Sequence, residues 1–120
     1  MNSKVGLVDW KILKTVAQNF ETFIYLYFYN YKYMEEKLKI FKALGDETRL
    51  KIVEFLLSGE KCVCEITAHV GRMQSTVSLQ LAKLESFGIV ESRREGKKIY
   101  YKIKNRKVIK ILKIIGGGER

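Results

Sequence analysis

The sequence predicts a mostly α-helical domain with one small β-hairpin near its C-terminal end. From Met34 to Gly88, apolar residues recur three and four positions apart, which is typical of helices that bury one face. From Ile89 to Lys104 the spacing changes to two, which is typical of strands. The chain of 120 residues, 47% of them hydrophobic, is long enough for one domain with a modest core.

Residues that start or stop helices divide the helical part into four helices. Asp46 is expected to cap the second helix, because its carboxylate can accept a hydrogen bond from a free backbone N–H. Gly45, Gly59, Gly71 and Gly88 are expected to end the four helices in turn. The apolar stripes expected on these helices are Leu38, Phe41 and Leu44, then Leu50, Val53, Leu56 and Leu57, then Val63, Ile66 and Val70, and last Val77, Leu81 and Leu84.

After these helices the chain is expected to form a hairpin and one more helix. The strands Ile89–Arg94 and Lys97–Lys104 are joined by Glu95-Gly96, a two-residue link of the hairpin type. On the second strand, alternation places Ile99, Tyr101 and Ile103 on one face. The predicted domain spans residues 34–116, with 117–120 as a tail. Gly116–Gly118 is expected to end the last helix, whose apolar residues are Val108, Ile111, Leu112 and Ile115.

Residues 1–33 form an N-terminal extension with a different composition, since eight aromatic residues fall between positions 20 and 33. Three interpretations are open. The extension forms an extra amphipathic helix, with Ile12, Val16, Phe20 and Phe23 on one stripe. Alternatively Phe23–Tyr33 forms a strand, because aromatic residues favour strands. The third interpretation is that the natural chain begins at Met34 and that the preceding residues are upstream sequence read in frame.

Basic charge is concentrated in one stretch of the chain. There are 23 Lys and Arg residues against 13 Asp and Glu, and ten of the basic residues fall within residues 93–113, which hold one acid, Glu95. This concentration predicts a surface that meets a polyanion. The longest apolar run without charge has ten residues. A membrane span needs about 20, so we expect a cytoplasmic protein with no membrane span.

A short helix, a Gly-containing turn, a second helix and a basic hairpin follow one another in the order of a winged helix-turn-helix. Once Val77, Leu81 and Leu84 face the core, the opposite face of their helix carries small polar groups that suit base edges and phosphates. We therefore expect double-stranded DNA as a partner. The residues expected to contact it are Gln74, Ser75, Thr76, Ser78, Leu79 and Gln80 on the helix, and Arg93, Arg94, Lys97 and Lys98 on the hairpin.

Three stretches of the chain carry a family resemblance: FKALGDETRLKIVEFLL, CVCEI and QSTVSLQLAKLESFGIVESRREGKKIYYKI. They resemble the ArsR/SmtB-type winged-helix repressors of bacteria and archaea, from about Glu35 to Asn105. The resemblance implies a homodimer that binds a palindromic operator, represses transcription and is released by a signal. Leu79 departs from the pattern, since the family often has a polar or basic side chain there, which puts the sequence preference in doubt rather than the fold.

A homodimer is also expected on physical grounds, because a small monomer contacts too few bases for useful specificity. The last helix has more apolar surface than a terminal helix can safely expose. The alternative is that this helix closes the core of its own chain. The residues of the first and last helices expected to pair with a second copy are Leu38, Phe41, Val108, Ile111, Leu112 and Ile115.

Cys62 and Cys64 form a candidate site for a soft metal or metalloid ion, or for a thiol redox switch. Two cysteines so close in sequence exclude a disulfide framework and suggest a reducing compartment. In a regular helix, side chains two positions apart point about 200° apart, so the thiolates converge only where the segment is extended. The resemblance implies such a site, yet arsenic-sensing members have a third Cys where this chain has Thr67. The alternative is two small apolar residues without a function.

These expectations favour a transcriptional regulator over two other classes of protein. A winged-helix module that binds only protein has little need for the basic charge on the hairpin and last helix. An enzyme is disfavoured, because the chain has one His, no glycine-rich phosphate loop and no full set of metal ligands.

Overall fold

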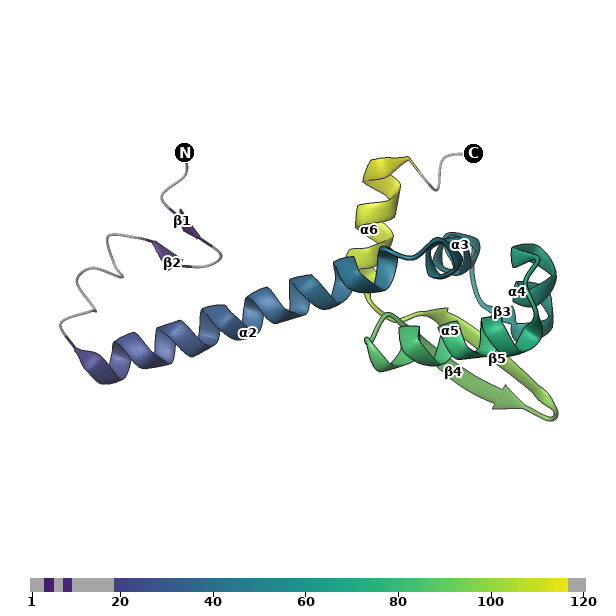
Figure 1. The fold of residues 1–120 in the computed structure, drawn as a ribbon, viewed down its shortest axis with the longest axis horizontal. Helices are drawn as coiled ribbons and strands as arrows, with labels where there is room; N and C mark the ends of the chain where they lie inside the picture. The colour runs from purple at the N-terminus through teal and green to yellow at the C-terminus, as the bar shows by residue number, and fades with distance from the viewer. Residues whose placement is uncertain (1–3, 6–7, 10–18, 117–120) are drawn as a thin grey trace. The chain divides into compact units, whose positions relative to one another are not determined.

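The computed structural model describes residues 4–5, 8–9 and 19–116 (Figure 1). The chain divides into two compact units, residues 1–39 and residues 40–120. In the first unit, the strands β1 (Lys4–Val5) and β2 (Val8–Asp9) pair in the antiparallel sense. The first unit also contains most of α2 (Phe20–Leu44), and the last residues of this helix belong to the second unit.

The helix α2 is continuous over 25 residues, so the interpretation of Phe23–Tyr33 as a strand is wrong. Strand propensity in aromatic residues reflects packing on a neighbouring strand, and the described residues offer this segment no such partner. From Phe20 onward the extension is helical, whereas Ile12 and Val16 lie outside the described residues. Among the helices that the structure describes, none combines the length and the apolar character that a bilayer crossing requires.

The second unit contains the predicted succession of helices, hairpin and helix, with one added strand. The prediction of a mostly helical fold with a small hairpin is confirmed. Asp46 caps the helix after α2, as predicted, by accepting a hydrogen bond from the backbone N–H of Arg49 at 3.0 Å. After the end of α2, the elements of this unit are α3 (Glu47–Leu56), β3 (Lys61–Cys62), α4 (Val63–Val70), α5 (Gln74–Ser86), β4 (Val90–Glu95), β5 (Lys98–Ile103) and α6 (Arg106–Ile115).

The sheet of this unit has three antiparallel strands in the order β3-β5-β4. Glu95 pairs with Lys98, so the turn is Gly96-Lys97, one residue later than predicted. Gly96 has a φ of 62°, and a positive φ at the first central position is what a type II′ hairpin turn requires. The strand β3 was not predicted, because two residues are too few to show a periodic pattern.

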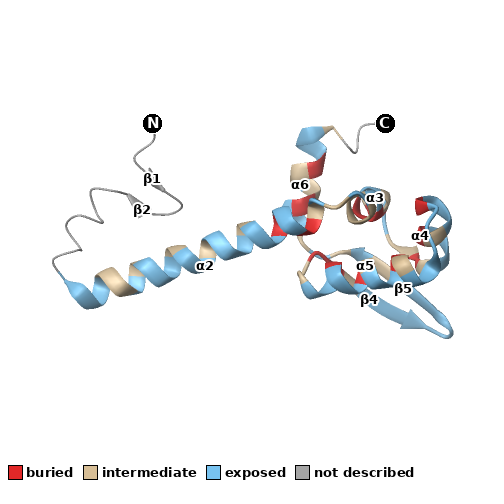
Figure 2. Cartoon of the chain, viewed as in Figure 1, coloured by how far each residue is buried: buried red, intermediate tan, exposed pale blue. Residues whose placement is uncertain are grey.

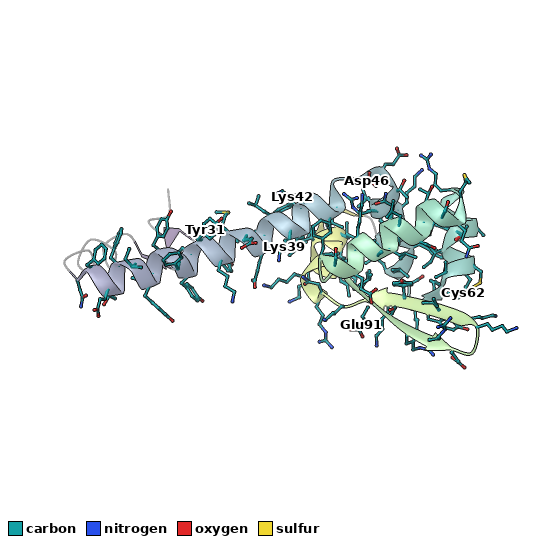
Figure 3. All side chains as sticks on the ribbon, turned by 60° about the horizontal axis from the view of Figure 1, so that its bottom comes forward. Tyr31, Lys39, Lys42, Asp46, Cys62 and Glu91 are labelled. Carbon is teal, nitrogen blue, oxygen red and sulfur yellow. A yellow bond between two sulfur atoms is a disulfide. The ribbon has the colours of Figure 1, made fainter. Side chains whose placement is uncertain are left out.

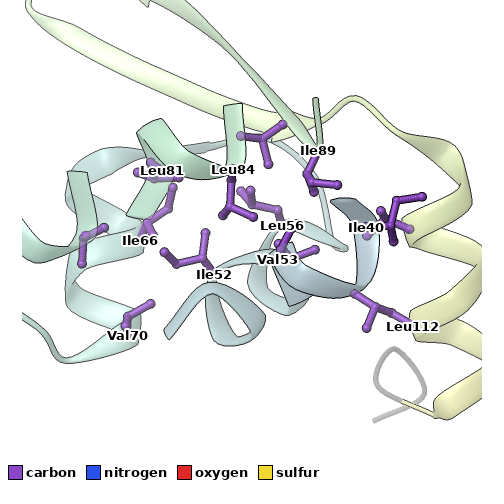
Figure 4. Close-up of a cluster of buried hydrophobic side chains, with 14 residues drawn as sticks. Ile40, Ile52, Val53, Leu56, Ile66, Val70, Leu81, Leu84, Ile89 and Leu112 are labelled. Carbon is purple, nitrogen blue, oxygen red and sulfur yellow. The ribbon is translucent and has the colours of Figure 1, made fainter. Parts of the chain in front are cut away.

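The core of the second unit is made of side chains from all of its helices and from the start of the hairpin (Figure 4). Val77, Leu81 and Leu84 of α5 are fully buried, as predicted. In α3 the predicted apolar stripe is partly wrong. Ile52, which was not predicted to face the core, is fully buried, and Leu50, which was, is only half-buried. The buried cluster consists of Ile40, Ala43, Ile52, Val53, Leu56, Ile66, Val70, Val77, Leu81, Leu84, Ile89, Val90, Val108 and Leu112.

The two ends of this unit bury fewer of the predicted residues than expected (Figure 2). Near the end of α2, Ile40 and Ala43 enter the core, whereas the predicted Phe41 remains exposed. Adjacent residues point in different directions around a helix, so Ile40 and Phe41 cannot both face the core. In α6, Val108 and Leu112 are buried within their own chain, so their assignment to a dimer interface is wrong. The alternative, that α6 closes its own core, is confirmed for these two residues.

The contrast between the two faces of α5 predicts the result of one pair of substitutions. We expect Leu84→Ala to lower the free energy of unfolding by about 2–5 kcal/mol, since it leaves a cavity in the core. Leu79→Ala, on the exposed face of the same helix, should change it by no more than about 0.5 kcal/mol. Urea denaturation followed by circular dichroism measures both. Equal losses in the two variants would contradict the described orientation of α5.

Candidate nucleic-acid interface

The helices α4 and α5 and the turn between them form a helix-turn-helix. Gly71 ends α4 with a φ of 72°, a left-handed conformation that favours glycine, and its N–H donates to the Thr67 carbonyl at 3.1 Å. Met73 precedes α5 and gives it no side-chain cap. The first N–H groups of α5 are therefore left for water or an anion, and a helix N-terminus favours negative charge.

The helix α5 presents small polar groups on the face opposite its buried stripe. Gln74, Ser75, Ser78 and Leu79 are exposed, and Thr76 is half-buried. These residues are exposed because the buried stripe of Val77, Leu81 and Leu84 fixes the orientation of the helix, which leaves its opposite face in contact with water. The orientation predicted for this helix is confirmed, and contact with DNA stays a prediction.

Gln80 differs from the other predicted contacts, because its side chain is already held by Arg49. The Arg49 guanidinium donates from Nη1 to Gln80 Oε1 at 2.9 Å. It also donates from Nε to the Ala43 carbonyl at 2.8 Å and from Nη2 to the Lys42 carbonyl at 3.1 Å. Arg49 thus links the end of α2 to the middle of α5. Periodicity gives no signal for this role, which depends on a contact 31 positions along the chain.

On the hairpin, the predicted basic residues fall into two groups. Arg93 is paired: it donates to Glu60 Oε1 at 2.6 and 2.9 Å and to Glu95 Oε2 at 2.8 Å. The hydrogen bond to Glu60 raises the pKa of Arg93 most, and the hydrogen bond to Glu95 raises it further. The hydrogen bond between Arg93 and Glu60 also lowers the pKa of the Glu60 carboxyl group. Arg94, Lys97 and Lys98 are exposed and form no ion pair within the described residues.

The side chains of Cys62 and Cys64 converge, and the backbone at Cys62 is extended, as the sequence analysis required for such convergence. Cys62 lies at the end of β3 with extended backbone angles (φ −79°, ψ 158°), and α4 begins at the next residue. Although the sequence suggested a reducing compartment, Cys62 and Cys64 are joined by a disulfide in this structure, with their Cα atoms 5.4 Å apart (Figure 3). Cys62 is buried and Cys64 is exposed.

Cys62 also forms the start of α4. Its sulfur accepts a hydrogen bond from the backbone N–H of Glu65 at 3.4 Å, and Glu65 Oε1 accepts one from the backbone N–H of Cys62 at 3.1 Å. This reciprocal pair is a capping box, which satisfies two backbone donors at the helix end. A change at the Cys62 sulfur therefore acts directly on the first helix of the helix-turn-helix.

A pocket of about 290 Å³ brings the cysteine pair next to the predicted DNA face. One wall is the start of α4, a second is α5 and the third is the hairpin near its turn. Chemical change at the sulfurs thus occurs in a space bounded by the exposed polar face and by two free cations. The lining residues are Cys62, Val63, Cys64, Gln74, Ser78, Leu81, Lys97, Lys98, Ile99 and Tyr101.

The chain is similar to known regulators over this same region. The family model described as "Bacterial regulatory protein, arsR family" matches residues 46–92. An uncharacterized HTH-type transcriptional regulator of Methanocaldococcus jannaschii is 40% identical over 82 residues, which cover 68% of this chain and 92% of that one. A homodimeric winged helix-turn-helix DNA-binding domain of Mycobacterium bovis has a TM-score of 0.65 and 33% identity, covering 70% of this chain and 78% of that one.

The chain belongs to the ArsR family. Members of this family regulate transcription, and the resemblance to ArsR-type repressors is confirmed. The CadC cadmium resistance regulator of Listeria innocua is 41% identical over 75 residues. The match covers 62% of this chain and 63% of CadC, so the chain spans less than two thirds of that relative's length.

In this ArsR-family protein, the neighbours of the cysteine pair are engaged elsewhere. Thr67 occupies the position at which the arsenic-sensing members have a third Cys, and its hydroxyl donates a hydrogen bond to the Val63 carbonyl at 2.8 Å. The ring of His69 stacks on Phe55, with ring centroids 4.0 Å apart. Among the described residues, no group of three or more His, Cys, Asp or Glu is placed to hold a metal ion. Of the residues that line the pocket, Cys62 and Cys64 alone carry sulfur, the soft donor atom that thiophilic ions prefer.

Arg49 provides a test of the link between α2 and α5. We expect Arg49→Met to lower the free energy of unfolding by about 1–3 kcal/mol, because Gln80 and two main-chain carbonyls lose their donor. Arg94→Met on the hairpin is the matched control, since Arg94 is exposed and should tolerate the change. Urea denaturation measures both, and equal midpoints for the two variants would argue against the link.

Proposed function

We propose that this ArsR-family protein is a repressor that binds a palindromic operator as a homodimer. In this proposal α5 enters the major groove and the hairpin of β4 and β5 acts as a wing on the adjacent phosphates. The observation that carries the proposal is the arrangement of α5. Its buried stripe leaves Gln74 and Ser78 exposed beside the pocket that the free cations Lys97 and Lys98 also line.

The proposed contacts are divided by the chemistry of the side chains. Amide and hydroxyl groups on α5 suit base edges, and the methyl groups of Leu79 suit a thymine methyl. The free cations of the wing suit phosphates. Gln80 and Arg93 are given supporting roles, since Arg49 holds the first and two carboxylates hold the second. The proposed contact set is Gln74, Ser75, Thr76, Ser78 and Leu79 for bases, and Arg94, Lys97 and Lys98 for phosphates.

Two features support dimerisation: a single winged helix contacts few base pairs, and apolar residues of the first and last helices are exposed. One winged helix reads a short half-site, and a palindrome read twice doubles the contacts. The relative from Mycobacterium bovis is described as homodimeric. Of the residues predicted for the interface, Leu38, Phe41 and Ile115 are exposed and Ile111 is half-buried. These four remain the proposed dimer contacts of the first and last helices.

The signal that we propose for release of DNA is a thiophilic ligand, or oxidation, at Cys62 and Cys64. CadC is named for cadmium resistance, which makes soft ions a reasonable class. Two sulfurs without a third donor best suit a trivalent arsenical with one organic substituent, because that arsenic needs only two thiolates. The disulfide must first take up two electrons and two protons from a dithiol reductant. The two thiols then displace the oxygen of R–As=O as water and form two As–S bonds.

The location of the pair explains how such a signal reaches DNA. Cys62 is the cap of α4, and both sulfurs line the pocket that Gln74 and Lys97 also line. A ligand of several atoms on the sulfurs occupies this space and disturbs the capping box. Both effects act on the elements that we assign to the groove and the phosphates, so binding of ligand and of DNA should oppose one another.

The division between base and phosphate contacts predicts two kinds of variant. Arg94→Ala and Lys97→Ala should each weaken binding to any duplex and reduce the slope of log affinity against log salt by about one. Ser78→Ala should relax the sequence preference recovered from a random DNA library and leave that slope unchanged. Fluorescence anisotropy at several salt concentrations, together with sequencing of the bound library, measures both.

Arg93→Ala is the control for the wing, because Glu60 and Glu95 already neutralise that cation. Its effect on the salt slope should be clearly smaller than that of Arg94→Ala. A wild-type protein that binds no duplex even at low salt would sink the DNA proposal and favour a protein-binding module.

The cysteine proposal predicts that the reduced protein takes up one phenylarsine oxide per chain and then releases DNA. Mass spectrometry of the reduced, desalted protein gives the stoichiometry, and anisotropy gives the change in DNA affinity. The disulfide form and the variant Cys64→Ser are controls that should take up none, because each lacks the pair of free thiols. Uptake without any change in DNA affinity would leave a thiol pair but no sensor.

A further inference from the structure

The two cysteines of the disulfide differ in their access to solvent. Cys62 exposes 3% of its surface, whereas Cys64 is exposed. A disulfide exchanges with a free thiol when a thiolate attacks one of its two sulfurs, and access to that sulfur is one of the conditions that set the rate. A thiolate from solvent therefore reaches the sulfur of Cys64, and the sulfur of Cys62 is the one that leaves.

The position of Cys62 favours its departure as a thiolate. Its sulfur caps α4 and accepts a hydrogen bond from the backbone N–H of Glu65 at 3.4 Å. A helix N-terminus stabilises negative charge, and a hydrogen bond to a charged acceptor is stronger than one to a neutral acceptor. The departing thiolate is thus stabilised by the same N–H that the disulfide sulfur already binds.

The pocket beside Cys64 is lined by positive charge. Of the residues that line it, Lys97 and Lys98 are the charged ones, and both are exposed and free of ion pairs among the described residues. Gln74 and Ser78 add an amide and a hydroxyl to the lining, and both groups can donate hydrogen bonds to carboxylate oxygens. A ligand that suits these groups is an anion.

The acidic residues next to these positions in the sequence do not line the pocket. Glu65 accepts a hydrogen bond from the backbone N–H of Cys62, and Glu95 is paired with Arg93. The pocket has a volume of about 290 Å³. Pockets for small molecules begin at about 300 Å³, so this one suits a compact ligand.

We propose that Cys64 takes up a small thiol that carries carboxylates, by exchange with the disulfide, while Lys97 and Lys98 bind the carboxylates. The thiolate of the ligand attacks the sulfur of Cys64 and forms a new S–S bond with it. The bond between the two cysteines breaks, and its electron pair leaves with Cys62 as a thiolate. The incoming sulfur is oxidised and the sulfur of Cys62 is reduced, so the step needs no other reactant.

The consequence for DNA rests on the proposed function. In that proposal Lys97 and Lys98 meet phosphates, and carboxylates tethered to Cys64 neutralise the same two cations. A neutral thiol on this sulfur leaves both cations free. The anionic adduct should therefore weaken DNA binding more than a neutral adduct does.

The first experiment measures exchange in the absence of DNA. The full chain in its disulfide form is treated with mercaptosuccinate, which has two carboxylates, or with neutral 2-mercaptoethanol, and N-ethylmaleimide stops the reaction. Mass spectrometry of the peptides gives the rate and locates each group. We expect mercaptosuccinate on Cys64 and maleimide on Cys62. The reverse distribution would contradict the proposed direction of attack.

Two matched double variants test the role of the lysines. Lys97→Gln with Lys98→Gln should slow mercaptosuccinate about tenfold, because charge in a cleft raises the rate of an oppositely charged ligand by about 10- to 1,000-fold, and should leave the rate of 2-mercaptoethanol unchanged. Comparing each thiol with its own rate on the unmodified chain cancels differences in reactivity. Lys110→Gln with Lys113→Gln removes the same charge from α6, outside the pocket. Equal slowing by both pairs, or none by the first, would overturn the proposal.

A second experiment measures the effect on DNA. Cys62→Ser retains a good N-cap for α4 and leaves Cys64 as a single thiol, which forms a stable mixed disulfide with the oxidised form of either reagent. In fluorescence anisotropy, the mercaptosuccinate adduct should bind duplex DNA about tenfold more weakly than the 2-mercaptoethanol adduct, with a salt slope lower by about two. Equal affinities would refute the competition for the two lysines. If neither adduct nor the unmodified chain binds DNA, the proposed function fails, and the exchange rates still decide the thiol site.

Discussion

The arrangement of the proposed DNA face depends on the burial of one stripe on α5. Val77, Leu81 and Leu84 are inaccessible to water, and they fix the rotation of the helix about its own axis. Each contributes about 1.5–3 kcal/mol by leaving water, so turning the helix to hide its polar groups would cost several times that amount. The Arg49 hydrogen bond to Gln80 acts on the same helix from the polar side. The small polar residues are exposed because the alternative orientation is energetically excluded.

The sequence predicts this part of the fold well, because its signals are local and periodic. The caps at Asp46 and Gly71 and the stripe of α5 are all read from neighbours within a few positions. Periodicity does not tell which of two adjacent apolar positions turns inward, and Ile40 and Phe41 exchange roles for this reason. The partners of Arg49, Gln80 and Arg93 lie up to 33 positions away, and no local pattern reports them. The disulfide depends on the extended strand β3, which is too short to detect.

The number of basic residues on the hairpin is larger than the number that is free of an acidic partner. Arg93 is shared between Glu60 and Glu95, and Lys102 lies 3.4 Å from Glu91 on the neighbouring strand. Such exposed pairs add little to stability, about 0–1 kcal/mol each. Their consequence is one of position: Arg93 is directed at Glu60 and Glu95, and Lys102 faces Glu91 across the two strands. Arg94, Lys97 and Lys98 lie close to the turn and form no ion pair among the described residues, so these are the cations of the hairpin tip that are free to meet an anion.

The last turns of α2 are fixed by the core of the second unit. Ile40 and Ala43 are buried there, as on an amphipathic helix of 3.6 residues per turn. Phe41 lies about 100° further around the helix axis and exposes 62% of its surface. The core therefore fixes the rotation of this end of the helix, and the position of Phe41 outside the core is a direct consequence of the burial of its neighbour Ile40.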